Sequence, residues 1–141
     1  MATALAAIVA GGLVAAAIAH DSSRHVVWMV AYLVLVVGVA QAVLGLGQAL
    51  LPARLPSLRW RVGEWALFNA GNAGVIAGTL VARSVPVVIG TALFVIALLL
   101  FLTGLNNAGR GWPLQVYRAV LAVACIGAIT GLALSLIGIS R

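Results

Sequence analysis

Glu64 is the residue whose chemistry is most unusual for its surroundings, because it is one of only two acidic residues in the chain and lies at the edge of an apolar run. A charged carboxylate at membrane depth is costly, so such a residue is a candidate proton-binding group of a transporter. A structural role is the preferred alternative. In the first turn of a helix the helix dipole would stabilise the charge, and Arg59 and Arg61 are near enough in sequence to pair with it. The sequence leaves both interpretations open.

Uncharged polar side chains within the apolar runs are the second set of candidates. They could line a path for a small polar solute or hold a ligand. Carboxamides inside a membrane also hydrogen-bond between helices and fix the register of their packing, which is their commoner role. We therefore expect packing first and ligand binding second for Gln41, Gln48, Asn69 and Asn72.

His20 and His25 are the only imidazoles in the chain. A spacing of five residues across a turn could let both reach one metal ion or one haem edge. Two ligands without a cysteine or a second carboxylate nearby make a thin metal site. The simpler interpretation is that both histidines are exposed at the membrane interface while Asp21 pairs with Arg24. We expect no cofactor, and binding of haem, copper or quinone is the least favoured hypothesis.

The residue sets of the usual catalytic sites are missing from the sequence. The single cysteine, Cys125, lies inside an apolar run, so no intrachain disulfide or CxxC pair can form. No phosphate-binding loop, GxGxxG, HExxH or spaced pair of carboxylates occurs. We therefore expect a protein that is not an enzyme.

The composition of the chain that positions these residues is that of a membrane protein. It is 65% hydrophobic and 7% charged, whereas soluble domains are about 45–50% apolar and about 25% charged. A transmembrane helix needs roughly 20 mainly apolar residues, so five spans use nearly all of the chain. The apolar runs are continuous rather than alternating, which disfavours a β-barrel. The predicted fold is an all-α integral membrane protein with one transmembrane helical domain, residues 1–141.

The apolar runs predict a bundle of five transmembrane helices, or of four if the first run is a secretory signal. That run ends in Ala17-Ile18-Ala19, a small-x-small pattern typical of signal cleavage, but it lacks the positively charged leader of a signal peptide. The predicted spans are residues 2–20, 26–51, 63–83, 86–105 and 114–139.

Eight arginines, no lysine and a net charge of +6 characterise the connections between the spans. Five arginines fall on one side of the predicted membrane and three on the other, which favours the first side, and hence the N-terminus, as cytoplasmic. Arginine without lysine, with abundant alanine, valine and glycine, favours a bacterial inner membrane. The dispersed charges do not suggest nucleic-acid binding. The first side carries Arg54, Arg59, Arg61, Arg110 and Arg118, and the second carries Arg24, Arg83 and Arg141.

Small residues form stripes at helical spacing on the second, third and fifth predicted helices. Such stripes let helix backbones approach closely, so we expect these three helices to form the core. The fourth helix has the most lipid-like sequence and is expected to lie outermost or to contact another subunit. The stripes of the third and fifth helices contain Gly71, Gly74, Gly78, Gly127 and Gly131.

These observations favour a small multi-pass protein without catalytic machinery. It would serve as an accessory or assembly subunit of a membrane complex or form a homo-oligomer, with the lipid bilayer as its other partner. The main alternative is a proton-coupled transporter or channel that uses Glu64.

Overall fold

The computed structural model describes residues 1–20, 23–52, 54–105 and 108–139, with the backbone alone at 138–139. Helix makes up 85% of the described residues. The described ranges contain five continuous helices and no strand, which confirms the predicted all-helical class. Asp21 of the predicted Asp21–Arg24 pair and the C-terminal Arg141 lie outside these ranges.

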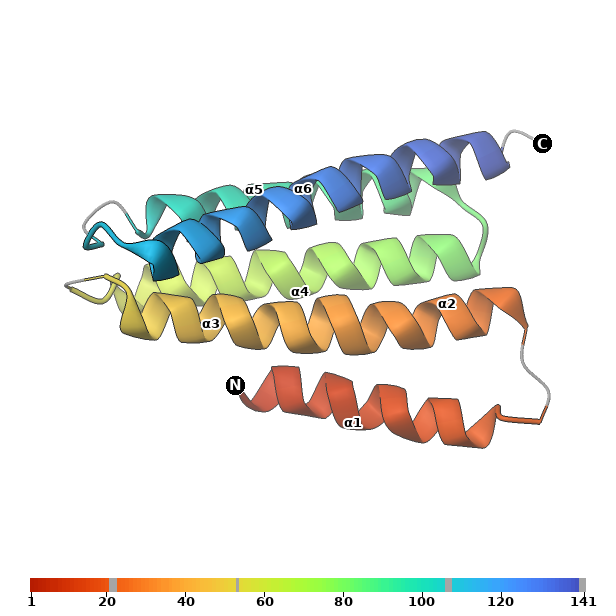
Figure 1. The fold of residues 1–141 in the computed structure, drawn as a ribbon. Helices are drawn as coiled ribbons and strands as arrows, with labels where there is room; N and C mark the ends of the chain where they lie inside the picture. The colour runs from red at the N-terminus through yellow and green to blue at the C-terminus, as the bar shows by residue number, and fades with distance from the viewer. Residues whose placement is uncertain (21–22, 53, 106–107, 140–141) are drawn as a thin grey trace. The chain divides into compact units, whose positions relative to one another are not determined.

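The chain divides into two compact units, Met1–Gly47 and Gln48–Arg141. The single transmembrane domain expected from the sequence stays a prediction. In the first unit, α1 (Ala2–Ala17) packs against the long helix that begins at Arg24 (Figure 1). Gly11 of α1 faces Val34 on this helix, so the absence of a side chain at Gly11 lets the two helices approach.

The long helix changes its winding along its length. It begins as α2 (Arg24–Tyr32), continues as the π-helical segment η1 (Leu33–Ala40) and ends as α3 (Gln41–Leu50). The Ser23 Oγ accepts a hydrogen bond from the Val26 backbone N at 3.4 Å, and this N-cap explains why the helix begins at Arg24 rather than at the predicted residue 26. The π-helical segment has no counterpart in the sequence analysis.

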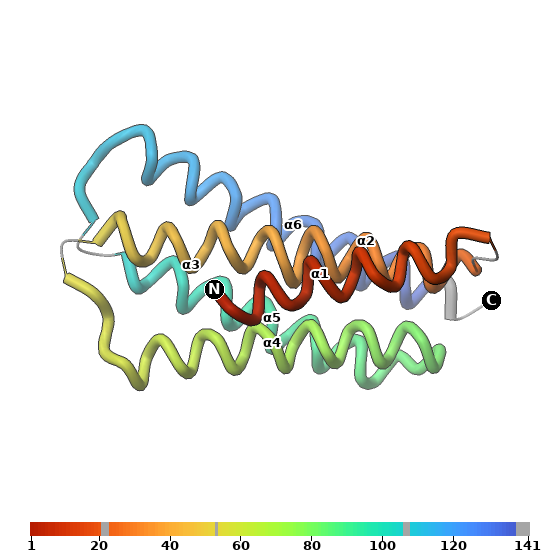
Figure 2. Tube along the Cα trace, turned by 90° about the horizontal axis from the view of Figure 1, so that it is seen from below, coloured from red at the N-terminus to blue at the C-terminus, as the bar shows by residue number. Residues whose placement is uncertain are grey.

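The second unit contains α4 (Leu58–Leu80), α5 (Ser84–Thr103) and α6 (Trp112–Ile139). The helices α4 and α5 lie side by side (Figure 2). They approach so closely that a Cβ at Gly71 would lie 2.6 Å from the Phe94 backbone N, and one at Gly90 would lie 2.6 Å from the Gly71 O. This approach is possible only without side chains at both positions.

An aromatic cluster continues the α4–α5 contact away from these glycines. The Phe68 side chain of α4 is fully buried. Its ring centroid lies 5.1 Å from that of Phe94 and 6.1 Å from that of Phe101, both on α5. Offset and edge-on aromatic pairs at such distances contribute beyond the area that they bury. The core of the second unit therefore runs along the α4–α5 interface.

This arrangement differs from the expected packing of the helices. The most apolar stretch of 18 residues in each helix shows the difference. In α5, 39% of this stretch is buried, whereas in α6 only 6% is buried. The helix α5, which we expect from the sequence to lie outermost, is thus well buried. The helix α6, which we expect in the core, is largely exposed. In lipid an apolar surface has no hydrophobic reason to be hidden, so close backbone approach, not hydropathy, decides which helices pack.

Three helices in the described ranges are long and apolar enough to cross a membrane: Arg24–Leu50, Ser84–Thr103 and Trp112–Ile137. Of the other two, α1 is shorter, with 16 residues. The helix α4 has 23 residues but contains two arginines, a glutamate and two asparagines, which lower its hydropathy. It also begins at Leu58 rather than at the predicted residue 63, because the Ser57 Oγ caps it by accepting from the Trp60 backbone N at 3.3 Å.

Candidate functional site

Glu64 lies at the centre of a buried hydrogen-bonded cluster in the second unit. Its side chain is fully buried. Its Oε1 accepts a hydrogen bond from the Gln48 Nε2 at 2.7 Å and another from the Trp60 Nε1 at 2.7 Å. Gln48 comes from the end of α3, whereas Trp60 lies one turn before Glu64 on α4. We call Gln48, Trp60 and Glu64 the carboxylate cluster.

The two oxygens of Glu64 have different surroundings. A carboxyl oxygen has two lone pairs, and both on Oε1 are engaged by the two donors. No group in the described part of the chain donates a hydrogen bond to the buried Oε2. A buried polar atom without a partner is costly. Oε2 is therefore the atom at which a proton, a cation or a polar solute would be stabilised.

The two features that support a structural role for Glu64 from the sequence are both missing here. Glu64 is the seventh residue of α4, not a first-turn residue, and the helix dipole acts mainly within the first turn. The hydrogen-bond partners of Glu64 are Gln48 and Trp60 rather than Arg59 or Arg61.

Two residues that the sequence analysis did not select complete the surroundings of the cluster. A Cβ at Gly104, just after α5, would lie 2.9 Å from the Gln48 Nε2 and 3.4 Å from the Glu64 Oε1, so this glycine leaves room for the cluster. Tyr117 of α6 is buried and close enough for the charge of Glu64 to act on its phenol. The spacing of four residues between Trp60 and Glu64 was a signal for their contact, whereas Gly104 and Tyr117 gave none.

The other predicted polar residues do not join this cluster through a hydrogen bond that involves Glu64. Gln41 is buried in the first unit, and within the described residues its Oε1 has no hydrogen-bond partner. Asn69 donates from Nδ2 to the Trp65 O at 2.8 Å, and Asn72 donates from Nδ2 to the Phe68 O at 2.7 Å. These two donors bond the backbone of their own helix, one turn earlier. Of the four carboxamides, only Gln48 donates to Glu64.

His20 and His25 are both exposed; His20 lies in the connection between α1 and α2, and His25 is the second residue of α2. The described residues contain no group of three or more histidine, cysteine, aspartate or glutamate side chains that could hold a metal ion. Cys125, a free thiol that is partly buried, lies on α6, far along the chain from both histidines. Among the described residues, no third ligand joins the imidazole pair.

The predicted glycine stripes have different surroundings. Gly71, Gly74 and Gly78 all face the α5 backbone, where a Cβ at Gly74 would lie 3.0 Å from the Gly90 Cα and one at Gly78 would lie 2.7 Å from the Val87 N. A Cβ at Gly127 or Gly131 would meet nothing within 4 Å. The stripe on α4 lies at a helix contact, and that on α6 faces open space.

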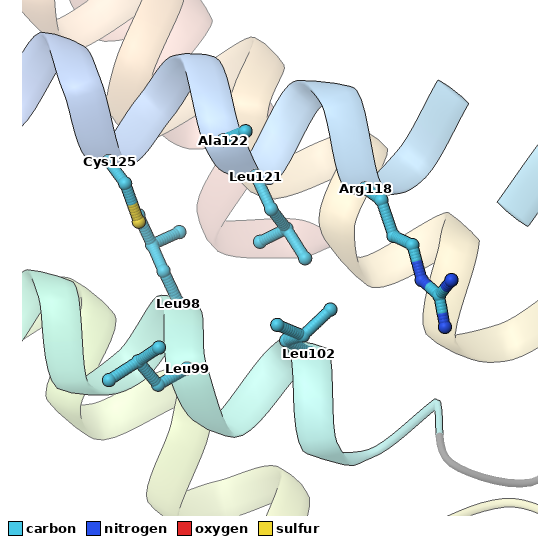
Figure 3. A pocket seen from close by; sticks show the side chains of 7 residues that line it. All are labelled: Leu98, Leu99, Leu102, Arg118, Leu121, Ala122 and Cys125. Atoms are coloured by element: carbon cyan, nitrogen blue, oxygen red, sulfur yellow. The ribbon is translucent and has the colours of Figure 1, made fainter. Parts of the chain in front are cut away.

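A pocket of about 520 Å³ lies between α5 and α6 (Figure 3). Its walls are mainly leucine side chains, with Arg118 at one end and Cys125 at the other. The sequence analysis assigned Arg118 to the membrane interface but predicted no pocket there. The full lining is Leu98, Leu99, Leu102, Arg118, Leu121, Ala122 and Cys125.

No protein-family model matches the chain, and no curated protein or solved structure is significantly similar to it.

Proposed function

We propose that the protein is a small proton-coupled transporter or channel in which the Glu64 carboxyl group binds and releases the proton. The observation that carries the proposal is the asymmetry of this group: Oε1 accepts two hydrogen bonds at 2.7 Å, while the equally buried Oε2 accepts none from the described residues. A structural carboxylate is expected to have both oxygens satisfied, because an unpaired buried charge is costly.

The cluster would hold Glu64 in place while its charge changes. The Gln48 and Trp60 donors both bond Oε1, so a proton can bind at Oε2 without displacing either of them. In the deprotonated form both of these hydrogen bonds are charge-assisted.

Proton flux into liposomes that contain the purified protein tests the proposal. We expect Glu64→Gln to abolish the flux, because the amide keeps the shape of the side chain but cannot exchange a proton. A matched control is Gln115→Leu, which removes an exposed carboxamide on α6 and should leave the flux unchanged. Wild-type flux in a folded Glu64→Gln variant, or no flux in the wild type for any tested ion or cationic solute, would contradict the proposal.

The fluorescence of Trp60 should change when Glu64 is protonated, because the indole N–H of Trp60 donates to the carboxyl group. A pH titration of tryptophan emission should show one transition in the wild type that is lost in both Glu64→Gln and Trp60→Phe. The comparison of these two variants separates Trp60 from the other three tryptophans. A transition that persists in Glu64→Gln would show that another group titrates.

We further propose that all five continuous helices cross a bacterial inner membrane, with the N-terminus in the cytoplasm. The 16 residues of α1 rise about 24 Å at 1.5 Å per residue, which is short of the roughly 30 Å hydrocarbon core. Local thinning of the bilayer accommodates such a mismatch at modest cost. The uneven distribution of the arginines supports the orientation. Reporter fusions at the connections test it: a periplasmic signal at Arg54 or Arg110 would reverse the topology.

A second candidate function is that of a non-catalytic accessory or assembly subunit, and the bare face of α6 favours it. Only 6% of the most apolar 18-residue stretch of α6 is buried. Gly127 and Gly131 on this helix face open space. Glycines at this spacing suit close contact with another transmembrane helix. Purification from the native membrane in a mild detergent tests this function, since a persistent monomer without any co-purifying protein would contradict it.

A further inference from the structure

The pocket between α5 and α6 combines an apolar surface with one cationic end (Figure 3). Leu98 and Leu121 form its buried wall, while Leu99 and Leu102 are exposed at its edge. Its volume of about 520 Å³ lies within the range of roughly 300–1,000 Å³ of pockets that hold small molecules. The pocket thus has room for part of an acyl chain and no polar wall to oppose it.

Arg118 supplies the charge at one end of the pocket. Its guanidinium group is exposed, and the chain has eight arginines but only two acidic residues. One of these, Glu64, is fully buried and bonded to Gln48 and Trp60. A guanidinium group in this position has the geometry to bind a phosphate in a bidentate manner.

We propose that this pocket is a binding site for one anionic phospholipid, with an acyl chain along the leucines and the phosphate on Arg118. The positions along α6 agree with this arrangement. Arg118 is the seventh residue of the helix, close to the end where the exposed Trp112 is placed to lie among lipid headgroups. Cys125 is two helical turns further, about 10 Å deeper along the axis, where the chain of such a lipid would lie.

Native mass spectrometry of the purified protein, with phosphatidylglycerol or phosphatidylcholine of identical chains added, tests this site. We expect one phosphatidylglycerol per chain to be retained, and phosphatidylcholine to be retained less. Arg118→Gln should lower the apparent affinity for phosphatidylglycerol by about fivefold, the effect of one basic residue near an anionic lipid surface. Arg118→Lys should restore much of it. Arg110→Gln is the matched control, because Arg110 is an exposed arginine of the same side that does not line the pocket.

Ala122→Trp tests the acyl chain separately from the charge, because Ala122 lines the pocket and its replacement fills that space. It should abolish retention with Arg118 intact. The rate of maleimide addition to Cys125 gives a second measurement: phosphatidylglycerol should slow it in the wild type but not in Arg118→Gln. Inorganic phosphate alone should not slow it, which distinguishes a lipid from a free anion.

Several outcomes would overturn the site. These are equal retention of the two lipids, wild-type retention in an Arg118→Gln variant with unchanged helicity and elution volume, or protection of Cys125 by phosphate alone. If Arg118→Gln or Ala122→Trp does not fold, the comparison of the two lipids on the wild type still decides the proposal. The site does not depend on the proton chemistry of Glu64, so Glu64→Gln should retain phosphatidylglycerol like the wild type.

Discussion

The α4–α5 pair and α6 carry similar stripes of glycine, yet the structure packs only the first. Gly71, Gly74 and Gly78 on α4 lie against the α5 backbone, which itself has a glycine at position 90, where a Cβ would lie 2.6 Å from the Gly71 O. Gly127 and Gly131 on α6 face open space. A stripe of small residues thus shows that a helix can be approached closely, and it needs a matching small residue on the partner before two backbones meet.

The same comparison shows that high hydropathy does not keep a helix exposed. Of the three apolar helices, α5 contains the most hydropathic stretch, and this stretch also has the largest share of buried residues. A leucine-rich helix gains nothing from leaving lipid, but it gains van der Waals contacts where a partner fits its surface. Three predictions follow from this contrast, from the largest expected effect to the smallest.

The aromatic cluster of the α4–α5 pair should give the largest effect. Phe68→Ala removes a fully buried ring that contacts both Phe94 and Phe101. We expect a loss of about 3 kcal/mol in the free energy of unfolding, the low end of the range for buried phenylalanine, because lipid rather than water replaces the lost contacts. Unfolding in mixed micelles, followed by tryptophan fluorescence, measures this loss.

Ile126→Ala is the matched control on α6, because the Ile126 side chain is 64% exposed. We expect a change within about 0.5 kcal/mol, as for other exposed positions. Equal losses in the two variants would mean that α6 is as tightly packed as the α4–α5 pair, which would contradict the comparison.

The two glycine stripes provide the second test. Gly71→Ala places a methyl group against backbone atoms at 2.6 and 2.8 Å, which α4 and α5 can accommodate only by separating. We expect a loss of about 1–3 kcal/mol, typical of overpacking. Gly131→Ala meets nothing within 4 Å and should stabilise the protein by up to about 1 kcal/mol through helix propensity. If Gly131→Ala were destabilising instead, the face of α6 would be covered by another helix in the assembled protein.

The composition and the continuous apolar runs predicted the all-helical class. The lengths of these runs predicted where the helices lie. The boundaries moved where a serine cap extended a helix over polar residues, as Ser57 does for α4. Within the candidate site, the contact between Trp60 and Glu64 is readable from a spacing of four on one helix. The bond from Gln48 to Glu64 joins two helices, and the rotation of each helix about its axis decides it. Neither rotation is encoded in the local sequence.

The turn that joins α4 to α5 provides the third and smallest test. Ala82 has a φ of +51°, a left-handed conformation that costs an L-residue roughly 1 kcal/mol and glycine almost nothing. The Arg83 N donates to the Gly78 O at 2.9 Å, which ends α4 in a Schellman-like cap where glycine is the usual residue. Ala82→Gly should therefore stabilise the protein by about 0.5–1 kcal/mol in the same micelle assay.

The connection from α5 to α6 supplies the control, because Gly109 has no positive φ and a Cβ there meets nothing within 4 Å. Gly109→Ala should leave the stability within about 0.5 kcal/mol of the wild type. A loss of stability in Ala82→Gly would mean that the turn is not held in the left-handed conformation.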